Sequence, residues 1–153
     1  MMQWMREPRL HARDFGFESI VWLDDVRMPL LDGVVWVKSY EAFVRHLERR
    51  GVPELICFDH DLSQEHYPRG EQDTREEIPY DRYTEKTGMA AALYVAEHQI
   101  PLQFWFVQSL NPRGRANIRR VLRAYRPEGE CTTLEIPFRL VPERSSTQPT
   151  GNR

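Results

Sequence analysis

Four short apolar runs, separated by longer polar segments, organise the chain. They are rich in β-branched and aromatic residues, which favours β-strands, and they span residues 19–23, 34–37, 55–58 and 103–107. Between them, two segments repeat apolar side chains every three to four residues, as amphipathic helices do. The helices are expected over 40–50 and 88–98, and a third over 116–125. Alternating strands and helices predict a mostly parallel sheet with right-handed crossovers.

The two ends of the chain depart from this regular pattern. Residues 134–140 alternate and form a candidate fifth strand, which Pro137 would restrict to an edge of the sheet. We therefore predict one α/β domain over residues 18–141, with an N-terminal arm over 1–17 and a disordered Ser/Thr/Pro-rich tail over 142–153. The link between the first two strands is so short that a helix is expected to be missing there.

Length and composition agree with a single globular domain. The chain has 153 residues, 41% of them hydrophobic, and a formal net charge of -2, so it has no general attraction to nucleic acid or membranes. Its basic residues are nineteen Arg and two Lys. Codon bias explains this imbalance, but Arg also binds phosphate through a planar fork. The two cysteines lack a CxxC spacing, and no run is long enough to span a membrane, so we expect a cytoplasmic protein.

Polar side chains follow three of the strands at the point where each strand ends. Asp24 and Asp25 follow the first strand, Asp59 and Asp61 the third, and Ser109 the fourth. Because the carboxyl ends of parallel strands share one edge of a sheet, we expect these side chains to meet. Clustered carboxylates repel one another unless they are protonated or bound to a cation, and Mg²⁺ (or Mn²⁺) prefers oxygen ligands. Turns and helix caps are the alternative explanation of each acidic pair alone.

Alternation gives the residues around the third strand's end different roles. Asp59 and Asp61 would point to the same side of an extended backbone, so one can act as nucleophile or metal ligand and the other as ligand or general base. His60 would point the other way, which favours a structural role over catalysis. The long polar stretch that follows, residues 63–85, is typical of a lid or binding loop.

Further candidates for phosphate or substrate binding surround the same edge. Backbone amides at a helix start and Arg side chains suit an anion, although ordinary turns and helix caps explain the same residues. The candidates are Lys38, Thr87, Asn111, Arg113, Arg115 and Asn117.

Five sequence motifs occur in a fixed order between about residues 20 and 122. They are LDDVRMP, VKSYEAF, FDHDL, EKTG and SLNPRGRANI. An acidic pair after strand one, an Asp after strand three and a hydroxyl after strand four resemble the receiver domains of response regulators. The five motifs together more specifically resemble the cyclic-phosphate-processing receiver-like family. This resemblance implies a receiver-like (flavodoxin-like) three-layer α/β fold with a mostly parallel five-stranded sheet.

The same resemblance implies roles for individual residues. Asp24 and Asp25 would bind the metal, and Asp59 would match the phosphoacceptor or nucleophile next to it. Asp61, Ser109 and Asn111 would line the pocket, with Thr87 near it. The chain departs from the family in having Gln108 where a His is common, and Met89-Ala90-Ala91 where an acidic residue is common. It also lacks a Lys near the fifth strand, which makes ordinary phosphorelay switching less expected.

These observations lead to one main functional hypothesis and two others. The main one is a Mg²⁺-dependent phosphohydrolase that opens the cyclic phosphate of RNA ends or nucleotides, with Arg113 or Arg115 offsetting charge. Its expected partner is a phosphorylated small molecule or an RNA end. The alternative is a non-catalytic module that binds metal and phosphate, or is phosphorylated at Asp59. A relation to haloacid-dehalogenase-like phosphatases ranks lowest, because their acidic pair comes late in the chain.

Overall fold

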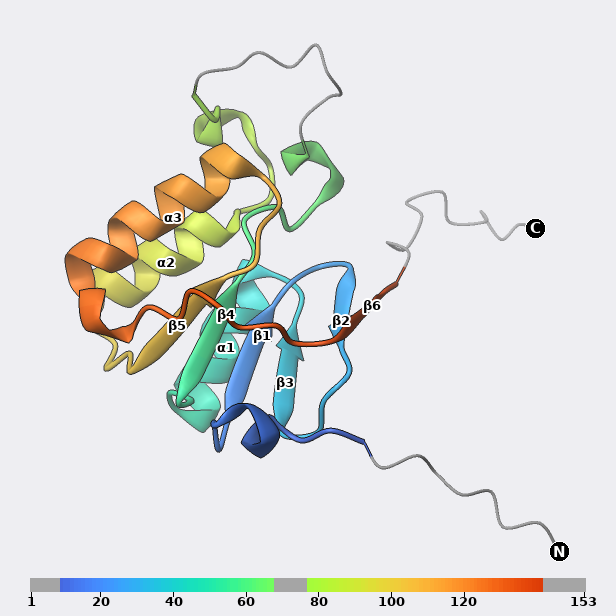
Figure 1. The fold of residues 1–153 in the computed structure, drawn as a ribbon. Coiled ribbons are helices and arrows are strands. Elements are labelled where there is room, and N and C mark those ends of the chain that lie inside the picture. Colours follow the sequence, from blue (N-terminus) through green and yellow to red (C-terminus); the bar gives the residue numbers. More distant parts are fainter. Residues whose placement is uncertain (1–8, 68–76, 142–153) are drawn as a thin grey trace, which may run out of the picture.

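A four-stranded parallel sheet forms the centre of the molecule (Figure 1). A computed structural model describes residues 9–67 and 77–141 of the chain. The strands of the sheet stand in the order β3-β1-β4-β5 and comprise β1 Ile20–Leu23, β3 Val34–Val37, β4 Leu55–Phe58 and β5 Phe104–Val107. The α-helices are α1 Tyr40–Arg50, α2 Gly88–Glu97 and α3 Pro112–Tyr125. The expected receiver-like α/β domain is therefore confirmed.

The strands pair so that their carboxyl ends lie at one edge of the sheet. The last residue of β1, Leu23, is opposite Val37 of β3 and Phe58 of β4. Phe58 is in turn opposite Val107, the last residue of β5. Whatever follows these residues in the sequence is consequently brought to the same edge, as the sequence predicted.

All three α-helices pack on one face of the sheet. Alternate strand residues such as Val21 and Ile56 are buried there against Phe43 of α1, Val95 of α2 and Ile118 of α3. The other strand residues point away from the helices. Burial on both faces explains why each of the two central strands reads as a continuous apolar run.

The opposite face is covered by irregular chain and a short 3-10 helix. Ile20, Trp22 and Cys57 are buried here with Ala12 of η1 (Ala12–Phe15) and with Ile136. Other 3-10 turns are η2 Gln64–His66, η4 Tyr80–Arg82 and η5 Pro127–Gly129. In the described residues, the third layer of this receiver-like fold is thus formed by these segments in place of α-helices.

The predicted five-stranded sheet needs correction. Residues Phe138–Leu140 do form a strand, β6, but it pairs antiparallel with β2, Arg27–Pro29, in a separate two-stranded sheet. Pro137 has no N–H to donate, and its carbonyl accepts from the amide of Leu30 at 2.8 Å. The main sheet therefore has four strands in the part of the chain described.

The expected absence of a helix between the first two strands of the sheet is borne out. The chain leaves β1, forms β2 and returns as β3 with no helix between residues 24 and 33. The sequence also predicted an arm over residues 1–17. Its described part, from residue 9, packs on the domain, because Ala12 is fully buried and donates its amide to the carbonyl of Asp32 at 2.8 Å. The tail over 142–153 lies outside the described residues.

Helix ends follow from local hydrogen bonding. Ser39 caps α1 by accepting the amide of Ala42 at 3.1 Å. Asn111 caps α3 in the same way, with Pro112 in the first helical position, where its missing N–H is harmless. The third helix therefore starts at Pro112 and not at the predicted Ala116. Within the described ranges, none of the helices is long and apolar enough to cross a membrane.

Two glycines permit the helices to approach the end of β4. A Cβ atom at Gly88 would lie 1.6 Å from the carbonyl oxygen of Asp59, and one at Gly114 would lie 2.3 Å from the imidazole ring of His60. The amide of Gly88 also donates to the carbonyl of His60 at 2.8 Å. Both helix starts therefore depend on the absence of a side chain at these positions.

We expect Gly88→Ala to destabilise the protein by about 1–3 kcal/mol or more, because the backbone must move to make room for the methyl group. Thermal unfolding of the variant, compared with the neighbouring Met89→Ala, measures this effect. Alanine is the better helix former, so an unchanged or higher unfolding temperature for Gly88→Ala would show that the close approach is not required.

Candidate metal and phosphate site

Three carboxylates meet at the carboxyl edge of the sheet. Asp24, Asp25 and Asp59 each contribute an oxygen atom, and these atoms all lie within 4.8 Å of one another. Asp24 and Asp59 are buried, and Asp25 is half-buried. The first two residues follow β1 and the third follows β4, so the in-register pairing of these strands produces the cluster.

Local hydrogen bonds hold each carboxylate in place. One oxygen of Asp24 accepts the backbone amides of Val26 and Arg27 at 3.0 and 2.8 Å. Oδ1 of Asp59 accepts the amide of His60 at 2.8 Å. The carboxylate of Asp25 accepts the hydroxyl of Tyr67 at 2.9 Å. Neighbouring groups of the chain therefore organise the cluster.

Burial and mutual repulsion disfavour the charged forms of this cluster. Burial, then the charge of Asp24, raises the pKa of Asp59 to about 8, and Asp25 and Asp61 act in the same direction. Burial also raises the pKa of Asp24, although amide hydrogen bonds oppose the shift. Burial and the neighbouring Asp25 raise the pKa of Tyr67, so its hydroxyl stays protonated as a donor.

One arginine lies against the cluster. Nη1 of Arg27 is 3.5 Å from Oδ2 of Asp24 and donates to the carbonyl oxygen of Gln108 at 2.9 Å. Its side chain is only 11% exposed. Arg27 lowers the pKa of both Asp24 and Asp59, so it offsets part of the negative charge of the cluster.

The donor set fits a divalent cation. Three carboxylates with oxygens this close together match the oxygen ligands that hard cations prefer. A bound cation would favour the ionised forms that burial opposes. Asp24, Asp25 and Asp59 are the residues that would hold it, and the chemistry of the set does not distinguish Mg²⁺ from Mn²⁺.

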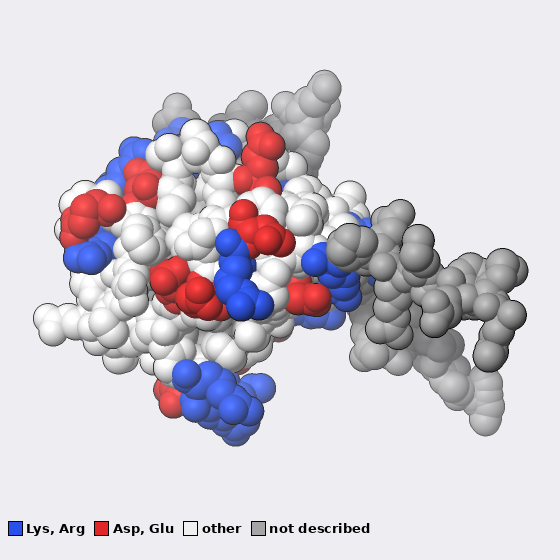
Figure 2. Space-filling view, turned by 60° about the horizontal axis from the view of Figure 1, so that its bottom comes forward, with Lys and Arg blue, Asp and Glu red and all other residues white. Residues whose placement is uncertain are grey.

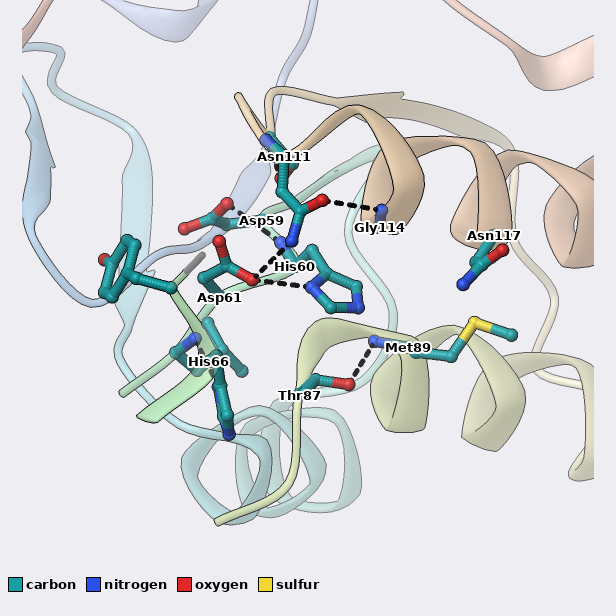
Figure 3. A network of polar contacts seen from close by, with 12 residues as sticks. Asp59, His60, Asp61, His66, Thr87, Met89, Asn111, Gly114 and Asn117 are labelled. Carbon is teal, nitrogen blue, oxygen red and sulfur yellow. Dashed lines mark hydrogen bonds and ion pairs between the residues drawn. The ribbon is translucent and has the colours of Figure 1, made fainter. Parts of the chain in front are cut away.

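A second polar group, centred on His60, lies beside the acidic cluster (Figure 3). Nδ1 of the buried His60 is 2.7 Å from Oδ1 of Asp61, and its Nε2 is 2.9 Å from the hydroxyl of Tyr80. Nδ2 of Asn117 donates to the same hydroxyl at 2.9 Å. Since Tyr80 accepts from Asn117, its own proton can go to Nε2, which leaves the Nδ1 proton for Asp61.

The caps of the two following helices border this group. Asn111 donates Nδ2 to Oδ1 of Asp61 at 3.2 Å and accepts the amide of Gly114 at 3.0 Å. The buried Thr87 accepts the amide of Met89 at 3.1 Å, which is a helix cap. The buried Ser109 accepts the amide of Asn111 at 3.1 Å. Figure 3 shows Asn111 and Thr87 on opposite sides of the His60 ring.

Other predicted site residues have contacts elsewhere. Nζ of Lys38 stands 4.2 Å from the centre of the Trp36 ring, and the residue is exposed. Arg113 is exposed, and Arg115 approaches the carbonyl oxygen of Ser109 at 3.5 Å. In the part of the chain that the structure describes, Arg27 contacts the acidic cluster, and the sequence interpretation did not select it.

Both described ends of the predicted lid loop are tied together by His66. Nδ1 of this buried ring accepts the amide of Leu62 at 2.9 Å, and Nε2 donates to the carbonyl of Glu85 at 2.8 Å. Burial lowers the pKa of His66, which favours the neutral ring that this pairing requires. The same loop supplies Tyr67 and Tyr80 to the site. Their position in a long polar loop after the acidic motif was the only signal for them.

The two departures from the family pattern have clear contacts. Nε2 of Gln108 donates to the carbonyl of Leu23 at 3.0 Å, so its amide holds β5 against the end of β1. Met89 lies in the first turn of α2, close to Thr87 (Figure 3).

We expect Asp59→Asn to stabilise the metal-free protein at pH 8.5, because it removes a buried charge next to two others. The folded-state pKa of Asp59 lies above its unfolded value, so ionisation of this group lowers the free energy of unfolding of the protein as pH rises from about 4 through about 8. The gain in unfolding temperature, about 2–4 °C per kcal/mol, should therefore be small at pH 4 and grow toward pH 8.5. Thermal melts in chelator measure it.

The exposed Asp32 provides the matched control, since Asp32→Asn removes the same charge without burial. An Asp59→Asn protein that melts below the wild type in chelator at pH 8.5 would contradict the repulsion described here. Added Mg²⁺ should raise the unfolding temperature of the wild type and of Asp32→Asn, but not that of Asp59→Asn.

Comparison with known proteins agrees with this geometry. The family model described as the cyclic-phosphate processing receiver domain matches residues 19–124, a range that begins just before β1 and ends within α3. No curated protein and no solved structure matches the chain. The matched range includes the three acidic residues, the His60 group and the caps of α2 and α3. The chain therefore belongs to the family of cyclic-phosphate processing receiver domains.

Proposed function

We propose that this protein is a metal-dependent phosphoesterase that opens the cyclic phosphate of RNA ends or nucleotides. The observation that carries the proposal is the pairing of two groups at one edge of the sheet. The first is the cluster of Asp24, Asp25 and Asp59, and the second is Asp61 with its partner His60. In a family tied to cyclic-phosphate processing, they supply a cation site and a nearby proton acceptor.

The acidic cluster is assigned to the cation. Mg²⁺ or Mn²⁺ bound there would withdraw electron density from a phosphoryl oxygen and so favour attack on phosphorus. Asp24 and Asp59 are held by backbone amides, which keeps their oxygens aligned before substrate arrives. This preorganisation lowers the reorganisation needed during the reaction.

Asp61 is assigned to proton transfer. Oδ1 of this buried carboxylate is fixed by His60 and Asn111, which orients the group. Asp61 would accept a proton from a water molecule while the oxygen of that water molecule forms a bond to phosphorus. The bond from phosphorus to one ribose oxygen then breaks, and that oxygen takes the proton from Asp61. The products are a phosphate monoester and a free ribose hydroxyl.

Arg27 is assigned to the charge that develops on the phosphoryl group. It is the guanidinium in contact with the acidic cluster, and its carbonyl partner at Gln108 limits its movement. A cation held rigidly beside the reacting group stabilises developing negative charge more than a mobile one does. Arg27 thus takes the role that the sequence had suggested for Arg113 or Arg115.

The test is hydrolysis of a 2′,3′-cyclic nucleotide and of a 2′,3′-cyclic-phosphate oligonucleotide with Mg²⁺ or Mn²⁺. The wild type should turn over the cyclic phosphate, and chelator should abolish turnover. Asp59→Asn and Asp61→Asn should each lower kcat at least about a hundredfold, the range typical of a lost acid–base group. Arg49→Gln changes an exposed residue of α1, so it serves as the control and should leave turnover unchanged.

Two outcomes would contradict the proposal. One is the absence of turnover in wild type with either metal, and the other is equal turnover by wild type and Asp59→Asn. Stable labelling of Asp59 by a small phosphodonor, without ester hydrolysis, would instead support the non-catalytic signalling module.

A further inference from the structure

Positive charge is concentrated on one helix. Helix α3 carries five of the nineteen arginines and no acidic residue within Pro112–Tyr125. Arg115, Arg119 and Arg123 recur every fourth residue, about 6 Å apart along the helix axis, so they lie in a row. The face drawn in Figure 2 is different, because basic and acidic side chains are interspersed there in small groups.

The row borders a groove lined mainly by guanidinium groups. This groove has a volume of about 450 Å³ and is lined by Arg115, Arg119, Arg120 and Arg123 with Pro112 and Ala116. Glu130 pairs with Arg119 at 3.3 Å and with Arg123 at 2.7 Å. One carboxylate against four arginines leaves a net positive groove, and its pairing holds two of the side chains in place.

A second cavity with apolar walls adjoins the groove. It has a volume of about 390 Å³, and it shares Arg115 and Arg119 with the arginine groove. Its other walls include the exposed ring of Phe138, the half-buried ring of Phe106 and an edge of the buried Trp22, along with polar groups such as Glu135. Arginines next to aromatic side chains form the combination that binds single-stranded nucleic acid, because bases stack on rings while phosphates meet the charges.

The apolar cavity leads toward the acidic cluster. Gln108 and Ser109, at the carboxyl end of β5, line it. The guanidinium of Arg27 stands 5.5 Å from the centre of the Phe138 ring, and the same group contacts the carboxylate of Asp24. Arg27 thus connects the cavity wall to the candidate catalytic site.

We propose that the arginine groove and the apolar cavity bind a single-stranded RNA that leads into the acidic cluster. The phosphates would lie along the row on α3, a base would enter the apolar cavity, and the cyclic end would reach Arg27 and Asp24. This inference rests on the proposed function for the identity of the end that is bound. It adds that the substrate is an oligonucleotide and not a free nucleotide, because only a longer chain reaches the groove.

The test measures binding apart from catalysis. The probe is a fluorescent single-stranded RNA of about twelve nucleotides with an ordinary 3′-hydroxyl end, followed by anisotropy across a salt series. Arg119→Gln/Arg123→Gln should weaken binding several-fold. It should also make the slope of log affinity against log salt concentration shallower by about 0.7 for each phosphate that the variant no longer neutralises. Arg45→Gln/Arg49→Gln removes the same charge at the same spacing from the exposed side of α1, and it should change neither the affinity nor its salt dependence.

Glu130→Gln should change the affinity for RNA in the opposite direction. It keeps both arginines and removes the carboxylate between them, so RNA binding should become tighter by about two- to threefold at low salt. Thermal melts establish that each variant is folded. Weaker binding by Glu130→Gln, or equal weakening by the α1 and α3 pairs, would overturn the inference, as would tighter binding of an acidic peptide than of RNA.

The two proposals fail separately in these experiments. RNA binding without hydrolysis of any cyclic phosphate would support the proposed RNA-binding groove and contradict the proposed activity. Hydrolysis of a cyclic mononucleotide and of the cyclic-ended oligonucleotide with equal kcat/KM, with no RNA binding, would overturn the groove and leave the activity.

Discussion

The register of the parallel strands is the constraint on which the rest of this molecule depends. Because Leu23 and Phe58 are paired on neighbouring strands, the residues that follow them in the sequence are necessarily close together. The price of that geometry is the burial of like charges, and the raised pKa of Asp59 reflects it. Burial of like charges in this way is unfavourable, and a cation bound between the carboxylates would relieve their repulsion.

The polar edge is also shaped by backbone contacts that leave no spare room. Gly88 lets the start of α2 lie against the carbonyl of Asp59, and Gly114 lets α3 lie over the ring of His60. His60 is thereby enclosed and oriented, with Asp61 on one nitrogen and Tyr80 on the other. Packing of small residues thus determines the direction in which the carboxylate of Asp61 points.

Much of the fold could be predicted from periodicity alone. The strands at 34–37 and 55–58 and the helix at 40–50 have the predicted bounds, because continuous apolar runs and a clear helical repeat leave little choice. The segment at 134–140 was misassigned to the sheet, since alternation indicates a strand but not its partner. The start of α3 was predicted at residue 116 and not at Pro112, although Pro suits the first helical turn.

Within the site, residues next to a strand end could be predicted, and residues brought in by tertiary contacts could not. Asp24, Asp25 and Asp59 follow strands directly, so strand order alone places them together. Tyr80 comes from the loop, far along the chain from the residues it contacts. Arg27 is only three residues from Asp24, but the sequence did not indicate that its side chain turns back toward that carboxylate. Lys38 was selected for its position after a strand, but it stacks on Trp36 instead.

The double attachment of His66 has a consequence for how this edge can diversify. The imidazole of His66, near the start of the loop, bridges the amide of Leu62 and the carbonyl of Glu85, so it holds the two ends of the loop together. Closing a flexible loop twice as long costs only about 0.6 kcal/mol more. The segment between Tyr67 and Tyr80 can therefore be lengthened for a new ligand, while these two tyrosines and the carboxylates at the strand ends keep their contacts.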